Sequence, residues 1–400
     1  MRVSTNSVYE LGVASILRQQ EGMLKTQQQI STGRRILTPA DDPVAAARAL
    51  DVTQAESLNT QYARNRNNAK SSLGLAESVL QGVTTLIHDV RTVALNAGNP
   101  TLVDNDRASL ATELRGRLDE LIGLANSADG AGEYLFSGYQ GRTKPFAQTA
   151  AGAQYSGDQG QRLIQAAASR QIAVSDSGTD VFERIKNGNG VFVTTAAAAN
   201  SGSGVISPGT VVTPASLTGH NYQITFAAGA TTYNVVDTTT ATTLSTANPY
   251  TSGNSISFDG LQFELQGTPA GGDQFTVAPS TNQSLFKTLG DLIAVVAAPV
   301  SGQNGSAKLS NGLNSALLNL DRGLDNILGI RAAIGTRLQE VDTLQGAGED
   351  LAMQYQQTLS QLQDVDFAKA LSELSRQQVY LEAAQKSFVK VSSLSLFDYV

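Results

Sequence analysis

The chain contains few residues of the kinds that catalysis or metal binding requires. Its two histidines, His88 and His220, lie far apart, and no HExxH metal motif is present. The stretch Ser201–Gly204 lacks the glycine two positions before the serine that a nucleophile elbow needs, and there is no P-loop. Asp41 and Asp42 are adjacent carboxylates, but helix capping accounts for Asp42 without any role in chemistry. These patterns predict no catalytic residue, no cofactor and no metal ligand, and they disfavour an enzyme.

Composition narrows the remaining classes. The chain has 400 residues, which corresponds to about two to four domains, and 41% of them are apolar. The formal net charge is −7, and no lysine or arginine occurs between Lys186 and Lys287. Such a segment cannot neutralise phosphates, so we expect no nucleic-acid partner. The absence of cysteine excludes disulfides, thiol catalysis and cysteine-ligated metals.

The sequence predicts neither a membrane span nor a signal peptide. The longest apolar run, 292–300, has nine residues and contains Pro299, whereas a membrane helix needs about 20. The first apolar stretch, Gly12–Leu17, is interrupted by Ser15 and lacks the pattern of a secretory signal. If the protein leaves the cell, it therefore requires a route without a cleaved signal peptide.

Two matching apolar ladders with seven-residue spacing lie at opposite ends of the chain. Such spacing puts side chains on one side of a helix, and a lone helix cannot bury them. We expect each ladder to pack on the other and on further copies of the chain, forming an assembly interface; an internal bundle is the alternative. The ladder residues are Tyr9, Val13, Ile16, Met23 and Ile30, and Phe367, Leu374, Leu381, Phe388 and Val391.

Helical spacing extends well beyond the two ladders. Thr38–Pro43 breaks the first helix, and Pro43 with Asp42 as N-cap suits the start of the next. That second helix carries apolar residues in steps of three and four over 69–97 and should end at Gly98–Pro100. The expected helices cover about 1–36, 43–97, 104–129, a stretch from Ser284, 320–341 and about 350–393.

From about residue 133 the apolar pattern changes to the alternation typical of strands. Asp259-Gly260 has the composition of a tight hairpin turn between two of them. The expected strands are 134–139, 171–174, 222–226, 232–236, 255–258, 261–265 and 274–277. Most lie in the Gly/Thr/Ser-rich middle of the chain and predict a small β domain, either a sandwich or a partial barrel.

Together these patterns predict a mainly α fold with an inserted β domain. Long antiparallel heptad-patterned helices should come from both termini, and a β sandwich or partial barrel should lie at the centre. The expected domains are a terminal helical coiled-coil domain (1–42 plus 355–400), a helical rod domain with a small β-hairpin region (43–186 plus 281–354) and an outer β domain (187–280).

Several motifs resemble those of bacterial flagellins and, more closely, of the flagellin-like hook-associated protein 3 family. Ile30–Ile36 followed by Ala40–Asp42 is similar to the N-terminal flagellin signature, and Tyr134–Gly138, Gly335–Leu338 and Leu394–Val400 resemble later motifs of the hook-associated protein. The resemblance covers about residues 1–180 and 285–400. The motif residues are Gly33, Arg34, Asp41, Asp42, Pro43, Gly335 and Arg337.

This resemblance implies a structural subunit of the bacterial flagellum that forms the junction ring between hook and filament and serves motility. It implies self-assembly through the terminal helices, and export through the flagellar type III channel to an extracellular position without cleavage of a signal peptide. The implied partners are other copies of the chain, the hook-side junction protein, flagellin and an export chaperone at the C-terminal helix. A flagellin of the filament itself is the alternative, and a surface-binding role for the β domain is a more distant one.

Overall fold

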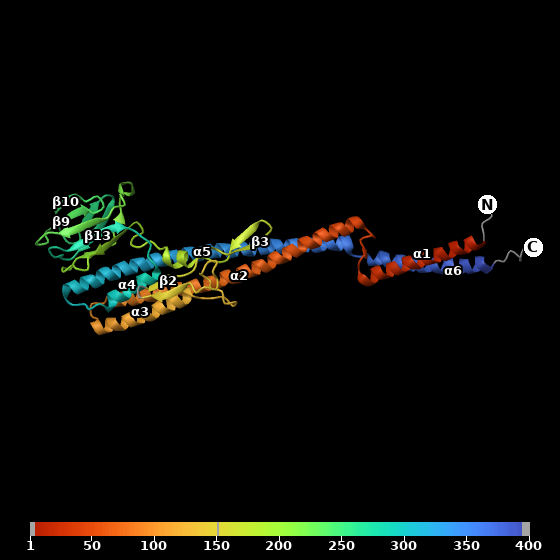
Figure 1. Cartoon of the computed structure of the whole chain (residues 1–400), viewed down its shortest axis with the longest axis horizontal. Coiled ribbons are helices and arrows are strands. Elements are labelled where there is room, and N and C mark those ends of the chain that lie inside the picture. Colours follow the sequence, from red (N-terminus) through yellow and green to blue (C-terminus); the bar gives the residue numbers. More distant parts are fainter. Residues whose placement is uncertain (1–4, 150–151, 394–400) are drawn as a thin grey trace, which may run out of the picture. The chain divides into compact units, whose positions relative to one another are not determined.

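The structure, a computed structural model, describes residues 5–149 and 152–393, which form two compact units. The first unit combines Met1–Arg64 with Thr343–Val400, and the second is Asn65–Asp342. Two long helices, α2 (Pro43–Ala97) and α5 (Gly302–Gln363), contribute to both. The predicted mainly α fold with an inserted β domain is confirmed (Figure 1). The three-domain division remains a prediction.

Helix α2 begins as its sequence predicts. Pro43 is its first residue, and the Asp42 carboxylate accepts a hydrogen bond from the Ala45 N–H at 3.0 Å. This contact satisfies one of the donors that a helix N-terminus leaves open. The helix ends at Ala97, before the predicted Gly-Asn-Pro break.

In the first unit, α1 (Thr5–Thr32) and α6 (Phe367–Ser393) lie side by side (Figure 1). The predicted final helix over 350–393 is wrong. Instead, α5 continues to Gln363, and a short bend separates it from α6. The Asp366 side chain accepts a hydrogen bond from the Lys369 N–H at 3.1 Å, so this aspartate caps a new helix where apolar spacing alone suggested continuity.

The second unit contains the main helical core. The apolar row of α2 is enclosed there, and Leu73, Leu80, Val83, Ile87 and Val90 are at most 1% exposed. Helices α3 (Asp104–Ala125) and α4 (Leu285–Ala297) pack side by side (Figure 1). Helix α4 begins as predicted, because the Ser284 hydroxyl accepts a hydrogen bond from the Lys287 N–H at 3.1 Å.

Short hairpins follow α3. They are β1 (Phe146–Thr149) with β2 (Gly152–Tyr155), and β3 (Leu163–Ala167) with β4 (Arg170–Ala173). The latter confirms the strand predicted at 171–174. The strand predicted at 134–139 is wrong. Gly138 there has a φ of +70°, and the Asp158 carboxylate accepts a hydrogen bond from the Tyr139 N–H at 2.9 Å, so the segment turns instead of extending.

The β domain consists of two antiparallel sheets. One has the order β10-β9-β8-β13-β5 and the other β11-β12-β6, with β7 also paired to β12. The strands are β5 (Phe192–Ala196), β6 (Val205–Ile206), β7 (Thr210–Val211), β8 (Tyr222–Phe226), β9 (Thr232–Asp237), β10 (Thr242–Pro249), β11 (Ser255–Phe258), β12 (Leu261–Gln266) and β13 (Gln274–Pro279).

Both sheets share one hydrophobic core, as the predicted sandwich requires. Ile224 and Phe275 enter it from one sheet, and Phe263 and Leu265 from the other. The predicted hairpin turn is also confirmed, because Asp259 and Gly260 have φ angles of 44° and 79° between β11 and β12. Strand β10 was missed, since it is a mostly exposed edge strand without an alternating apolar pattern.

Candidate assembly interface

The two terminal ladders meet inside one chain. The Tyr9 and Phe388 rings lie 5.1 Å apart between centroids, and a methyl group added to Gly12 would approach the Phe388 ring to 2.6 Å. Further along, Gly22 faces Gln377, and Gly33 faces Phe367. These contacts define a single antiparallel register for α1 and α6. The predicted pairing of one chain end with the other therefore occurs within the subunit.

This pairing leaves the ladders only partly covered. Tyr9, Phe367 and Val391 remain 54%, 51% and 52% exposed, respectively. The other ladder residues are half-buried: Val13, Ile16, Met23, Ile30, Leu374, Leu381 and Phe388. A two-helix pair cannot enclose a seam on all sides, so coverage by a second chain remains a prediction.

A second set of apolar side chains lies off this seam and is exposed throughout. On α1 it includes Leu17 and Leu24, which are 58% and 57% exposed. On α6 it includes Leu371, Val379 and Val389, which are 52%, 62% and 63% exposed. The predicted ladders do not include this set, although Leu17 and Leu24 are themselves seven residues apart.

The α1 part of this set borders a groove. The groove has a volume of about 470 Å³ and lies between α1 and the segment that follows it. Leu17, Leu24 and Leu37 supply its apolar wall, and Gln28 and Asp41 lie at its polar side. The first unit thus presents a groove on α1 with one apolar wall, and separate apolar residues on α6.

The N-terminal motif residues lie where two bends of the chain join. Gly33 ends α1 with a φ of +69°, and its carbonyl accepts a hydrogen bond from the Val365 N–H at 2.9 Å. Arg34 pairs with Asp364 in an isolated bridge. The Arg35 guanidinium donates a hydrogen bond to the Leu362 carbonyl at 2.9 Å. The bend after α1 and the bend before α6 are therefore held together, which aligns the two terminal helices.

Asp41 organises the same bend. Its carboxylate lies 2.5 Å from the Lys25 ammonium and accepts hydrogen bonds from the Leu37 and Thr38 N–H groups at 3.0 and 2.9 Å. The hydrogen bond from Lys25 is the main cause that lowers the pKa of Asp41 to about 2, and the backbone donors add to it. Asp41 therefore remains a carboxylate that ties α1 to the loop before α2. The next motif residue but one, Pro43, lies exposed at the start of α2.

The third motif lies in the other unit. Arg337 forms two hydrogen bonds with the Asp176 carboxylate at 2.9 and 3.0 Å, which fastens the segment after β4 to α5. A methyl group added to Gly335 would meet no atom within 4 Å, so nothing in the structure explains this glycine. These two residues do not join the ladder residues. The C-terminal motif Leu394–Val400 lies outside the described residues.

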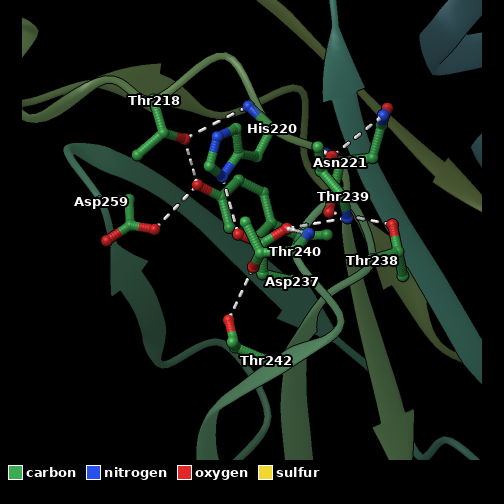
Figure 2. A network of polar contacts seen from close by, with 10 residues as sticks. Thr218, His220, Asn221, Asp237, Thr238, Thr239, Thr240, Thr242 and Asp259 are labelled. Atoms are coloured by element: carbon green, nitrogen blue, oxygen red, sulfur yellow. Dashed lines mark hydrogen bonds and ion pairs between the residues drawn. The ribbon is translucent and has the colours of Figure 1, made fainter.

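The two histidines, His88 and His220, lie in surroundings that suggest no catalytic role. His88 is exposed on α2, whereas the His220 ring lies 2.7 Å from the Asp237 carboxylate (Figure 2). Burial alone would raise the pKa of Asp237, but hydrogen bonds from Thr240, His220 and Thr239 outweigh it and lower the pKa to about 2. The bond from His220 ties the loop before β8 to the end of β9, and the bonds from Thr239 and Thr240 hold the turn after β9.

Within residues 5–149 and 152–393, no group of three acidic or histidine side chains is placed to hold a metal ion. In the same ranges, no helical stretch has the length and hydropathy of a membrane span.

Comparison with known proteins identifies the family. The chain is 31% identical over 399 residues to flagellar hook-associated protein 3 of Salmonella typhimurium, covering 100% of this chain and 99% of that protein. The chain belongs to the flagellar hook-associated protein 3 family. The bacterial flagellin N-terminal helical region also matches, over residues 3–141, as does the D2-like domain of flagellar hook-associated protein 1, over residues 195–279.

Solved structures of the family agree with this fold. Flagellar hook-associated protein 3 from Legionella pneumophila has 31% identity and a TM-score of 0.73, covering 78% of this chain and 98% of that one. Xanthomonas campestris FlgL has 29% identity and a TM-score of 0.73, covering 77% and 99%. Phase 1 flagellin of Salmonella naestved, by contrast, matches 34% of this chain and 27% of its own length, at 27% identity. The chain therefore fits the junction family better than flagellin.

Proposed function

We propose that this chain is a structural subunit of the bacterial flagellum, located at the junction between hook and filament, and that it assembles through its terminal helices. The observation that carries this proposal is the exposed apolar set on the first unit. Leu24 and Val379, on α1 and α6, are 57% and 62% exposed. Apolar area of this kind gains roughly 25 cal/mol for each Å² removed from water, so it favours burial against another subunit.

The arrangement favours a contact between different surfaces of neighbouring subunits, as in a ring. The groove on α1 and the apolar residues on α6 are different surfaces of one unit. When one surface of a subunit packs against a different surface of the next, the contact is heterologous, and repetition closes a ring or extends a helical array. We infer that α1 of one subunit receives α6 of its neighbour, and that the half-buried ladder seam becomes fully covered in the same step.

The remaining partners follow from the position. A junction subunit contacts the hook-side junction protein on one side and flagellin on the other. We further propose that an export chaperone covers the exposed residues of α6 before assembly, and that the chain reaches the extracellular flagellum through the flagellar export channel without cleavage of a signal peptide. In this role the subunit has no enzymatic activity.

The competing function is that of a flagellin, which would build the filament itself. The partial match to flagellins, limited to 34% of this chain in Phase 1 flagellin of Salmonella naestved, argues against it. Immunogold labelling of isolated flagella separates the two. We expect label confined to one narrow band between hook and filament. Uniform labelling along the filament would establish the flagellin function instead.

A pair of substitutions tests the assembly surface. In Leu24→Glu with Val379→Glu, both new charges lie at exposed positions of the monomer, so the subunit should fold normally. In the assembly the same charges would be desolvated without a partner, and filament formation should be lost. The matched control is Gln27→Glu with Gln378→Glu, which puts the same charges at neighbouring exposed polar positions. Normal filaments with the first pair, or equal loss with both, would exclude this surface.

A further inference from the structure

The β domain joins the helical part of the second unit through two adjacent chain crossings. Lys186 and Asn282 pair in an isolated bridge, and the Asn187 N–H donates a hydrogen bond to the Thr281 carbonyl at 3.0 Å. The Gln283 N–H donates in turn to the Ile185 carbonyl at 2.9 Å. The chain therefore enters and leaves the β domain at one point, and these crossings form a narrow base.

Outside the crossings, side chains of α5 hold backbone groups of the β domain. The Asn311 amide accepts a hydrogen bond from the Ile206 N–H at 2.9 Å and donates one to the Gly204 carbonyl at 3.0 Å. The Asn319 amide accepts one from the Gly188 N–H at 2.9 Å. The Arg322 guanidinium donates to the Asn189 carbonyl at 2.5 Å. Asn311, Asn319 and Arg322 are spaced eight and three residues apart, so they share one face of α5.

Each side of this joint has its own apolar core. All residues of the β-domain core lie between Phe192 and Val277. The helices bury separate residues, including Leu289, Leu292 and Leu320, each 0% exposed. Of the β-domain core residues, Ile206 also lines the cavity at the joint, whereas Ile224, Val235 and Phe263 do not.

A cavity of about 600 Å³ separates the two sides. Its lining combines amide side chains, including Asn200, Asn304, Asn311 and Asn314, with apolar ones such as Ile206, Val295 and Leu318. The side-chain carbonyl oxygen of Asn304 is buried and has no hydrogen-bond partner. A joint that contains a cavity of this size lacks the close packing that makes a domain interface rigid.

We propose that Asn311, Asn319 and Arg322 form a releasable latch, and that the β domain swings about its two crossings when the latch opens while both cores stay folded. The physical basis is a difference in magnitude. A neutral hydrogen bond contributes little net free energy because water replaces it on opening, whereas opening either core would expose many apolar side chains. The joint is therefore the least stable element between two stable bodies. This inference does not depend on the role at the junction.

Native-state hydrogen exchange of the full-length monomer, followed by NMR, tests the latch. The Ile206 and Gly188 amides report on it directly, because Asn311 and Asn319 accept their hydrogen bonds. The Phe226 amide, which donates to the Asp273 carbonyl at 3.0 Å, reports on the β core, and the Leu320 amide reports on the helices. We expect the two latch amides to exchange at least about tenfold faster than the core amides, and with little dependence on urea. Equal rates with equal urea dependence would overturn the proposal.

Substitutions separate a concerted swing from local fraying. Asn311→Ala removes two hydrogen bonds and should speed exchange at Ile206 by roughly 5- to 160-fold, the loss expected for two neutral side-chain hydrogen bonds. Because a swing breaks all latch contacts together, the same variant should also speed exchange at Gly188, and Asn319→Ala should speed exchange at Ile206. If each variant affects only its own amide, the contacts open separately and the swing is excluded.

Two control variants keep this test specific. Asn314→Ala alters the lining of the same cavity at an exposed position of α5. Asn326→Ala removes an equivalent amide that holds the Asp180 and Val181 carbonyls at 3.0 and 2.9 Å, outside the β domain. Neither should change exchange at Gly188 or Ile206 more than about twofold. Acceleration by both controls equal to that in Asn311→Ala would show a general loosening of α5 and overturn the latch.

Discussion

Apolar rows of similar spacing have different surroundings in the two units. In the second unit, Leu80 and Ile87 belong to the apolar row of α2, and each side chain is at most 1% exposed. In the first unit, none of the ten ladder residues on α1 and α6 is fully buried. The difference lies in the number of neighbours. Helices α3 and α5 lie against this part of α2, where Asp89 pairs with Arg117 and Glu77 pairs with Arg331, whereas α1 packs on α6. Spacing therefore determines which face of a helix is apolar, but not what covers it.

The largest effect should come from a charge in the incomplete seam. Leu381→Asp puts a carboxylate at a half-buried ladder position that neighbours would cover in the assembly. The cost should reach several kcal/mol per subunit on the order-of-magnitude scale for a buried, unpaired charge, and repetition around the proposed ring should abolish the junction. Filament formation in cells that carry only this variant measures it. Ser375→Asp, at an exposed position of the same helix, is the control. Normal filaments with Leu381→Asp would remove the assembly role of the ladder.

A smaller but clear contrast should separate the two rows in the monomer. Leu80→Ala leaves a cavity in the enclosed row and should lower the free energy of unfolding of the second unit by about 2–5 kcal/mol. Leu374→Ala, in the half-buried row, should cost less than about 1 kcal/mol, since much of its area already contacts water. Urea unfolding of the two variants, monitored by circular dichroism, compares them. Equal losses of unfolding free energy would mean that the seam between α1 and α6 is already fully buried in the monomer.

Arg337→Ala should have an intermediate effect confined to the second unit. Its two hydrogen bonds to Asp176 are largely shielded, with side-chain exposures of 21% and 11%. Their loss should cost about 1–2 kcal/mol and loosen the segment after β4, without affecting assembly. The nearby Arg170→Ala removes an ion pair with Glu340 whose arginine is 55% exposed, and it should cost at most about 1 kcal/mol. Thermal unfolding gives the stabilities. Loss of filaments with Arg337→Ala at unchanged stability would instead indicate a direct assembly role.

The sequence predicted the helices and strands better than the residues at which they end or the contacts between them. The α2 start was predictable, because Asp42 and Pro43 act locally. The break before α6 was not, because a capping contact of Asp366 overrides an apolar pattern that continues through it. The role of Gly33 in joining two bends depends on Val365, more than 300 residues away, and no local pattern reports such a contact.

The bend that aligns the terminal helices should weaken in acid. The pKa of Asp41 is lowered from its ordinary value of 3.8 to about 2, chiefly by the hydrogen bond from Lys25. A lowered pKa stabilises the folded state above the ordinary value, and this contribution disappears as the pH falls from about 4 to about 2. We therefore expect Asp41→Asn to weaken the bend at neutral pH but to have little effect at pH 2. Hydrogen exchange at the Leu37 and Thr38 amides, whose acceptor is Asp41, measures this. Equal effects at both pH values would exclude the carboxylate as the cause.

The smallest effect on assembly should come from the largest change, removal of the β domain. The chain enters and leaves this domain at paired crossings, where Lys186 faces Asn282, so a short Gly/Ser linker in place of residues 189–279 can span the gap. The helical core and the apolar residues of the first unit contribute nothing to the β-domain core and should keep their contacts. We expect a folded, exported subunit that still joins hook to filament, and swimming of cells that lack the native protein measures it. If the shortened subunit is folded and exported but no filament forms, the β domain contributes to the joint itself. The assembly surface would then include part of the β domain as well as the terminal helices.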